Sequence, residues 1–431
     1  MRGFRAGALA LSAAALLIGL AGVGGAATTK SGKPMLGLFI TGQDSWTLSH
    51  VNPLTLKRAR GLSLRVGSRT AAWSFSPDRS KLALADYAST GTLLLVDTGA
   101  MRSLGVVDLG AYGFVQLQAT FWPDQGRLYA LVTRLTRKED GSFDRSPSSI
   151  VTVDPATRKV VGERSLDGWA YGWAHGAGVL TFFLGPEDGV GPARLAVVGA
   201  DGSVRTVGLS GVQVGSDRFD LAHPSEIGRY ETPGLVVAPD GSRAFVVSPG
   251  QVAAVDLRSL DVSYHRLGSA SRRLQKGANE GKLRVAEMVG ADRLLVTGSD
   301  DTVSVDANGA QRLQPHPIGL QLVDTRDWSV KAVDATTSYA VVSSNGIFAM
   351  SLAWNAQKQR ALGGGATIYD LSGAKRAHIF NGQVVYALAV GSRAFVPREG
   401  QRYTIVSTTT GKIVRTLNGL MPEPLVGSGR G

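Results

Sequence analysis

A degenerate unit of about 40 to 60 residues recurs along the chain, and this repeat constrains the fold more than any other feature. A sheet built from one such unit cannot bury both of its faces, so successive copies must stack on one another in a ring. The repeat therefore predicts an all-β fold, a single β-propeller of four-stranded antiparallel blades. The clearest copy has a strand ending at Pro77-Asp78, apolar strands at 81–85 and at 92–97, and a fourth strand at 102–107.

One recurring marker allows the units to be counted. The third strand of each unit ends in Val-Asp or a variant of it, and the Asp is expected to be structural because its carboxylate can accept backbone N–H groups two residues further on. We count eight units and predict eight blades. Seven blades are the alternative if the incomplete units at the two ends of the chain share one blade. The markers are Val51-Asn52, Val96-Asp97, Val153-Asp154, 198–201, Val255-Asp256, Val323-Asp324, Tyr369-Asp370 and Val406-Ser407.

The two ends of the chain are predicted to close the ring. The first unit, residues 36–66, lacks an innermost strand, and residues 420–426 are the available donor. Both termini would then lie in one blade, which removes the open sheet edges that promote aggregation. The propeller is accordingly predicted to span residues 35–426, followed by a disordered tail at 427–431.

Residues 1–27 have the pattern of an export signal. Arg2 and Arg5 precede an uncharged Ala/Leu-rich core at residues 6–20, and small residues suited to cleavage follow at 24–27. The alternative is that the apolar stretch stays as an uncleaved membrane anchor. No comparable segment follows, so we expect no transmembrane body and an exported protein that is periplasmic, cell-surface or extracellular.

The chain has no cysteine and a formal net charge of +12. An exported protein without cysteine must be stabilised by burial and strand pairing, and thiolate zinc sites and iron–sulfur clusters are excluded. The positive charge favours anionic surfaces such as envelope polymers or lipid head groups, although solubility explains it equally well.

Arg272, Arg273 and Lys276 form a predicted anion-binding loop, with a solvated mobile loop as the alternative. Nucleic acid is not expected, because no base-stacking aromatic residues lie beside this loop.

The turn at residues 75–78, the apolar second strand after it and Val96-Asp97 resemble the YVTN-type (lactonase-like) β-propeller repeat family. This WD40-like pattern covers most of residues 36–419, although no copy spells the family tetrapeptide. The resemblance implies the fold strongly and the activity hardly at all, because members of the family include binding modules, surface proteins and some hydrolases.

In a propeller the innermost strands converge on a central channel, where ligands commonly bind. Trp169, Tyr171 and Trp173 alternate with small residues, so all three are predicted to project to one face of a strand. They would form either a stacking platform for a ligand or, as the favoured interpretation, packing between adjacent blades. The candidate ligand-binding residues at the channel are Arg69, Gln118, Trp169, Tyr171, Tyr339 and Tyr386.

Chemistry in the channel would depend on Glu231 and Glu287. The lactonase resemblance implies a calcium site, but calcium takes about six to eight oxygen ligands and only these two channel candidates qualify. Asp300-Asp301 is interpreted as a polar hairpin tip rather than as calcium ligands. We therefore expect a monomeric, non-catalytic module without a cofactor, which binds or scaffolds an anionic envelope polymer, a surface protein or a small polar ligand. The alternative is a lactonase-like, metal-dependent hydrolase with its site at the central channel.

Overall fold

The computed structural model describes residues 35–42, 45–67, 72–85, 91–110, 115–139, 143–176, 178–216, 229–268, 279–305, 311–355 and 360–425. The predicted export signal at 1–27 and the tail at 427–431 lie outside these residues. The described residues are all-β and form no helix, so no helix among them could span a membrane.

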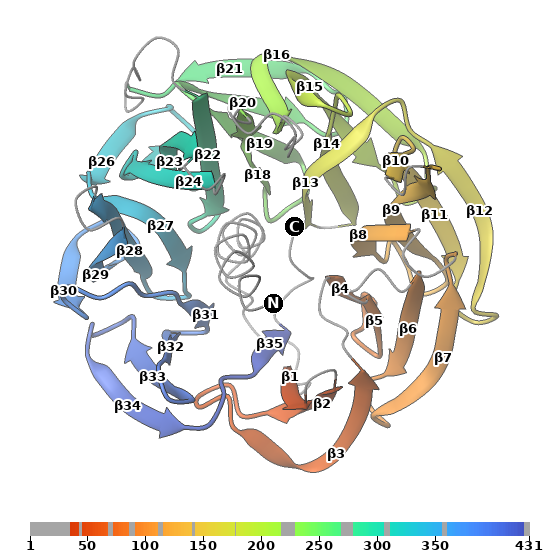
Figure 1. Ribbon diagram of the computed structural model, residues 1–431, viewed down its shortest axis with the longest axis horizontal. Helices are drawn as coiled ribbons and strands as arrows, with labels where there is room; N and C mark the ends of the chain where they lie inside the picture. The colour runs from red at the N-terminus through yellow and green to blue at the C-terminus, as the bar shows by residue number, and fades with distance from the viewer. Residues whose placement is uncertain are drawn as a thin grey trace.

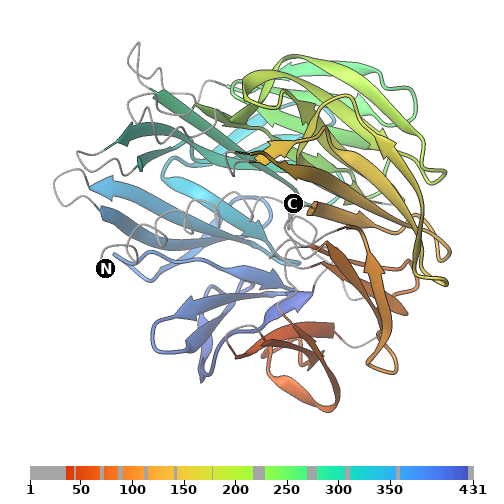
Figure 2. The same cartoon turned by 45° about the vertical axis from the view of Figure 1, so that its right-hand side comes forward.

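The described strands form six small antiparallel sheets and one ten-stranded sheet, arranged in a ring (Figure 1). The chain is thus a β-propeller. Figure 2 shows the twisted sheets packed face to face around the ring. The sequence predicted eight separate sheets, with seven as the alternative, whereas the described strands form six small sheets. The count differs because a short additional strand joins strands that were expected in separate sheets into the ten-stranded sheet.

The first three small sheets lie at the start of the ring, and each is given from its innermost strand outward. The sheet of the chain ends contains β35 (Glu423–Leu425), β1 (Met35–Gly42), β2 (Ser45–Val51) and β3 (Arg58–Gly67). The next contains β4 (Ala72–Phe75), β5 (Lys81–Ala85), β6 (Thr92–Asp97) and β7 (Arg102–Asp108). The third contains β8 (Val115–Phe121), β9 (Leu128–Arg137), β11 (Ser149–Asp154) and β12 (Lys159–Ser165), with β10 (Phe143–Arg145) also paired to β9.

The other three small sheets follow the same order. One contains β18 (Gly234–Val237), β19 (Arg243–Ser248), β20 (Gln251–Asp256) and β21 (Val262–Arg266). Another contains β27 (Thr337–Val342), β28 (Ile347–Asn355), β29 (Arg360–Tyr369) and β30 (Lys375–Ile379). The last contains β31 (Leu388–Val390), β32 (Arg393–Arg398), β33 (Arg402–Ser407) and β34 (Ile413–Asn418).

The ten-stranded sheet combines two antiparallel groups through β17 (Tyr230–Thr232). This short strand pairs antiparallel with β16 and in parallel with β22, so it bridges the two groups. The first group contains β13 (Trp169–Gly176), β14 (Val179–Gly185), β15 (Gly189–Val198) and β16 (Val204–Ser216). The second contains β22 (Asn279–Met288), β23 (Arg293–Val305), β25 (Leu320–Asp324) and β26 (Val330–Asp334), with β24 (Gln311–Pro317) also paired to β23.

The marker turns have the structural role that the sequence predicted. The carboxylate of Asp97 accepts the backbone N–H groups of Gly99 at 3.0 Å and Ala100 at 2.9 Å. These hydrogen bonds stabilise the charged form and hold the pKa of Asp97 below its ordinary value. The same bond two residues further on is made by Asp154, Asp201, Asp256, Asp324 and Asp370.

Arginine side chains at the start of a second strand fasten neighbouring sheets. Arg293 donates to the carbonyl oxygen of Leu371 at 2.8 Å, and Arg393 donates to that of Leu54 at 2.6 Å. Both carbonyls belong to the turn that follows a marker in the adjacent sheet. Because the guanidinium reaches a carbonyl oxygen in a turn, each bond ties two sheets together without extending either of them.

The first and last sheets pack against each other through an apolar cluster. Val51 and Leu56 from the first sheet lie with Phe395 and Ile405 from the last sheet. In addition, β35 pairs antiparallel with β1, and Leu36 lies opposite Leu425. The first and last described strands of the chain therefore belong to one sheet.

Candidate functional site

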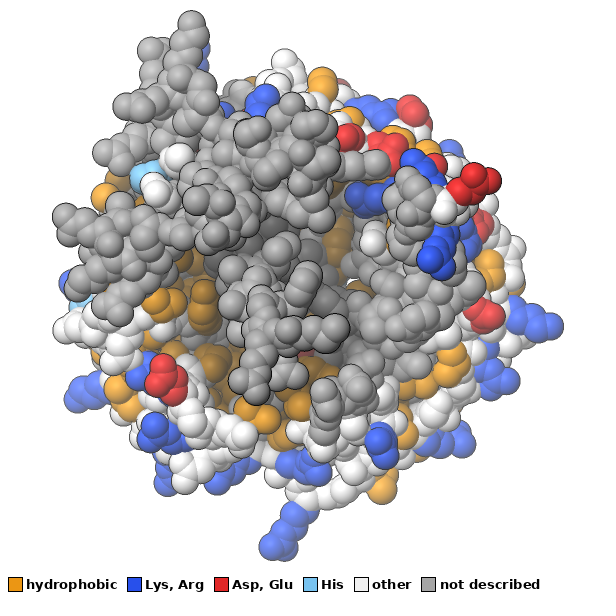
Figure 3. All heavy atoms as spheres, in the orientation of Figure 1, with side chains coloured by type: hydrophobic (Ala, Val, Ile, Leu, Met, Phe, Trp, Pro, Cys, Tyr) orange, Lys and Arg blue, Asp and Glu red, His pale blue; other side chains and the backbone are white. Residues whose placement is uncertain are grey.

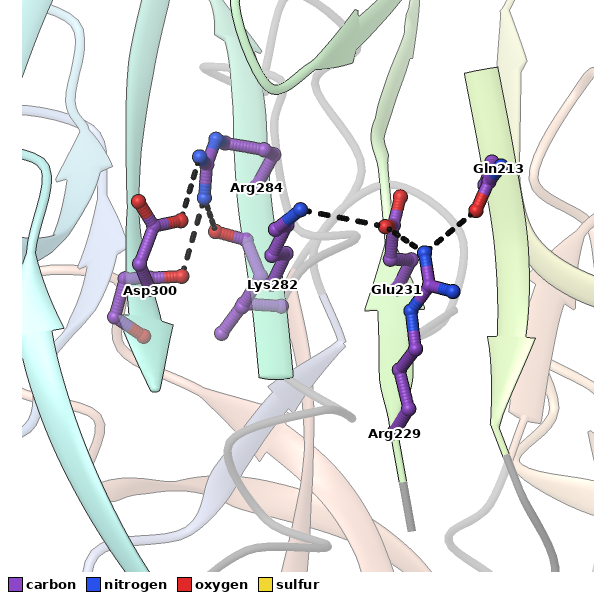
Figure 4. Close-up of polar contacts among 8 residues, drawn as sticks. Gln213, Arg229, Glu231, Lys282, Arg284 and Asp300 are labelled. Carbon is purple, nitrogen blue, oxygen red and sulfur yellow. Dashed lines mark hydrogen bonds and ion pairs between the residues drawn. The ribbon is translucent and has the colours of Figure 1, made fainter. Parts of the chain in front are cut away.

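Charged and polar side chains from four strands meet around β17 (Figure 4). The parallel pairing of β17 with β22 places Glu231 opposite Lys282, and the next pairing places Lys282 opposite Asp300. Side chains of directly opposed residues lie on the same face of a sheet. The pairing therefore builds a row of alternating charge across the strands, which we call the charged row.

Glu231 is held between two cations. Its Oε1 lies 2.9 Å from Nη2 of Arg229 and 3.6 Å from Nζ of Lys282. Nη2 of Arg229 also donates to Oε1 of Gln213 at 2.7 Å. Because Glu231 is buried and both of its neighbours are partly exposed, this end of the charged row has an excess of positive charge at the surface.

Arg284 and Asp300 form the buried end of the charged row. Nη2 of Arg284 lies 2.7 Å from Oδ1 of Asp300, and the two residues are only 2% and 1% exposed. Nη1 of Arg284 donates to the carbonyl oxygens of Leu283 at 2.9 Å and Ser299 at 3.1 Å (Figure 4). Oδ2 of Asp300 has no partner among the described residues. The guanidinium is thus well satisfied, whereas the carboxylate depends on this single cation.

The opposite face of the same strands carries a tyrosine–aspartate pair. The hydroxyl of Tyr230 donates to Oδ2 of Asp301. Burial raises the pKa of both groups, and the carboxylate of Asp301 raises the pKa of Tyr230 further. A Cβ atom at Gly281 would lie 2.1 Å from ring atoms of Tyr230. The ring therefore reaches Asp301 only because the residue between them is glycine.

We expect Gly281→Ala to lower the free energy of unfolding by about 1 to 3 kcal/mol, because the added methyl group must displace the Tyr230 ring or the backbone. The measurement is the midpoint of chemical denaturation. Gly208→Ala is the matched control, since a Cβ there meets nothing within 4 Å and should change stability by less than about 0.5 kcal/mol. Equal midpoints for the two variants would contradict the role assigned to Gly281.

The structure does not bring Glu231 and Glu287 together. Glu287 lies five residues beyond Lys282 in a stretch of β22 without a register shift, so its side chain is on the opposite face from Glu231 and about 16 Å further along the strand. It is 1% exposed, and its Oε2 accepts the backbone N–H of Val342 at 2.9 Å. Burial raises the pKa of Glu287 to about 8. The two carboxyl groups cannot share a metal ion or a water molecule.

The predicted row of three aromatic side chains on β13 is wrong. A register shift between Tyr171 and Trp173, with Gly172 at a φ of 42°, turns Trp173 to the other face of the strand. Trp173 packs with Ala170 in one core cluster, while Tyr171 lies against another and donates to the carbonyl oxygen of Pro186 at 2.6 Å. Trp169 is half-buried at the start of β13.

The other predicted channel residues take part in packing where they are described. The amide of Gln118 donates to the carbonyl oxygen of Ala170 at 3.3 Å, which links β8 to β13. Tyr339 belongs to an apolar core cluster, and the half-buried Tyr386 packs against the same cluster. Four predicted site residues lie outside the described part of the chain, namely Arg69, Arg272, Arg273 and Lys276.

Sequence reasoning missed the buried part of the charged row. Asp300 and Asp301 were interpreted as a polar hairpin tip, but both lie within β23 and are buried. The available signal was the pair of charged residues Lys282 and Arg284, which alternate with the apolar Leu283 and Val285 in β22. Within the described ranges, no three His, Asp or Glu side chains are grouped so that they could hold a metal ion.

Comparison with known proteins identifies the fold. No protein-family model matches the chain, and no curated protein matches it in sequence. Among solved structures, the dihydro-heme d1 dehydrogenase NirN is similar with a TM-score of 0.53 and 11% sequence identity, over 90% of this chain and 74% of that one. The fold is that of a β-propeller.

Two further solved structures are similar to the propeller at a lower level. A protein of unknown function from Desulfotomaculum acetoxidans aligns with a TM-score of 0.43 and 10% identity, over 92% of this chain and 99% of that one. The Cps50 (Swd1) β-propeller domain of Myceliophteria thermophila aligns with a TM-score of 0.37 and 14% identity, over 81% and 96%. At such identities a shared fold carries no information about activity.

Proposed function

We propose that the chain is an exported, non-catalytic β-propeller of the YVTN type that binds or scaffolds a component of an anionic envelope surface. The ligand would be an envelope polymer, a surface protein or a small polar molecule. We further propose that the propeller has eight blades. Six are the small sheets, and the two four-stranded groups that β17 joins in the ten-stranded sheet are the other two. The pairing of β35 with β1 supports closure of the ring by the two ends of the chain.

The observation that carries the binding proposal is the charge of the outermost strands. Each of them carries at least one exposed Lys or Arg, whereas the acidic residues in the same strands are Asp108, Glu163 and Asp334. Positive charge on a free sheet edge discourages strand pairing between molecules and attracts anions. The basic residues are Arg58, Arg60, Arg65, Arg102, Lys159, Arg164, Arg205, Arg266, Lys331, Lys375, Arg376 and Arg415.

The hydrolase alternative finds little support in the geometry. It requires Glu231 and Glu287 to act at one point, but they lie on opposite faces of the sheet. Glu231 is also engaged with Arg229 and Lys282. Both carboxyl groups have structural partners, which favours the binding module over the enzyme.

We expect the purified protein to bind dextran sulfate at low ionic strength and not to bind neutral dextran. Raising the salt concentration should weaken binding by at least tenfold between about 0.05 and 0.5 M, because the exposed charges become screened. Fluorescence polarisation with labelled polymers measures both effects. Absence of binding to dextran sulfate at low salt, or an affinity that does not change with salt, would contradict the proposal.

A further inference from the structure

The turn before the outermost strand lacks its acidic residue in the first and last sheets. Asn52 and Ser407 stand where the neighbouring sheets have Asp97 and Asp370. The Asn52 side chain still accepts the N–H of Leu54 at 2.8 Å, and the Ser407 side chain accepts that of Thr410 at 3.2 Å. The shape of the turn is therefore retained while its negative charge is absent.

Cationic side chains without an acidic partner among the described residues surround these two turns, and one of them, Arg58, stacks over the ring of Phe39 at 4.7 Å from its centroid. Residues 52–63 and 407–415 contain no Asp or Glu, and none of their cations forms an ion pair with a described residue. By contrast, Arg102 in the adjacent sheet lies 3.6 Å from Asp97. Over β3 and β34, the lower rim in Figure 3 shows blue side chains and no red ones. The exposed cations are Lys57, Arg58, Arg60, Lys412 and Arg415.

The same two segments expose large apolar side chains. Leu62 is 57% exposed and Ile413 is 51% exposed, and Leu54 and Val414 are also exposed. Leu62 lies in a bulge of β3, because Val51 pairs with Arg58 whereas Ser49 pairs with Ser63. The extra residues are carried away from the sheet, so the backbone itself keeps Leu62 in solvent. We call residues 52–63 and 407–415 together the seam surface.

The chain enters the fold beside the seam surface. Met35, the first described residue, pairs with Val51, which directly precedes the first of the two turns. The 34 residues that precede Met35 in sequence include the uncharged apolar segment at 6–20.

We propose that the seam surface docks on an anionic lipid bilayer. The proposal rests on the proposed binding function and names its partner and its face. Cationic side chains attract anionic head groups, and exposed aliphatic side chains enter the boundary between head groups and acyl chains. A soluble polyanion would bind the cations but would not contact the exposed aliphatic side chains of Leu62 and Ile413. The combination of cationic and aliphatic side chains on the seam surface therefore favours a bilayer.

The test is vesicle flotation of the full-length protein and of two triple variants with equal net charge. The seam variant is Lys57→Gln, Arg58→Gln and Arg60→Gln. The control is Arg127→Gln, Arg137→Gln and Arg258→Gln, three exposed cations outside the outermost strands and outside the seam surface. On vesicles of phosphatidylcholine with phosphatidylglycerol, we expect the seam variant to lose binding by about a hundredfold and the control by less than about threefold. The apolar leader is present in every variant, so it cancels in the comparison.

A third variant separates a bilayer from a polymer. Leu62→Ser with Ile413→Ser should weaken binding to the anionic vesicles and leave binding to dextran sulfate unchanged. If it leaves vesicle binding unchanged as well, the seam surface binds a polyanion and the bilayer proposal is wrong. Equal losses for the seam and control variants would overturn the assignment of the face, while the proposed function would stand. A wild-type protein that binds neither vesicles nor dextran sulfate would overturn the proposed function itself.

Discussion

Replacing Arg284 by Met is expected to destabilise the protein by about 3 to 5 kcal/mol, because it leaves the carboxylate of Asp300 charged and buried without a partner. Asp300 is 1% exposed, its Oδ1 lies 2.7 Å from Arg284, and its Oδ2 has no partner among the described residues. Among the described residues, no other side chain forms an ion pair with this carboxylate. The measurement is the midpoint of urea denaturation at neutral pH.

The matched control removes both charges. Arg284→Met combined with Asp300→Leu should recover most of the lost stability, because replacing a buried ion pair by apolar side chains is often neutral or stabilising. The carbonyl oxygens of Leu283 and Ser299 lose a donor in both variants, so that loss cancels in the comparison. A single substitution that costs less than about 1 kcal/mol, or a double variant no more stable than the single one, would show that Asp300 is not a buried charge.

Glu287→Gln is expected to stabilise the protein at alkaline pH and to have little effect at pH 5. Burial raises the pKa of Glu287 to about 8, so the folded chain retains a proton that the unfolded chain has released between about pH 4.5 and 8. The stability of the wild type therefore falls as pH rises through this window. The pKa difference sets an upper limit of about 5 kcal/mol, reached above pH 8.

The experiment compares the denaturation midpoints of wild type and Glu287→Gln from pH 5 to pH 9. The carbonyl oxygen of Gln can still accept the N–H of Val342, so the variant keeps the hydrogen bond and loses only the ionisation. Other titrating groups, such as His175, contribute equally to both proteins and cancel in the difference. A difference that does not grow with pH would mean that Glu287 is ionised in the folded chain at neutral pH.

The repeat and its turns could be predicted from the sequence because both are local. An Asp two residues before an accessible backbone N–H makes the same hydrogen bond in any sheet, and Asp97 and Asp324 do so as expected. The alternation of strands likewise depends on neighbouring residues. The bulge at Gly172 breaks the alternation of side chains between the two faces of β13, because one extra residue moves every later side chain of the strand to the other face.

The sequence by itself determined that the chain is all-β and built from recurring antiparallel units, because each unit carries its own strand pattern and turn chemistry. Only the tertiary structure decided how the charged residues meet. Glu231 and Lys282 are separated by fifty positions in the chain, and the parallel pairing of β17 with β22 alone places them side by side. The antiparallel pairing of β22 with β23 brings Arg284 to Asp300, and the odd spacing between Lys282 and Glu287 along β22 separates Glu231 from Glu287. Pairing between distant strands depends on how whole sheets pack, and no local pattern of residues specifies it.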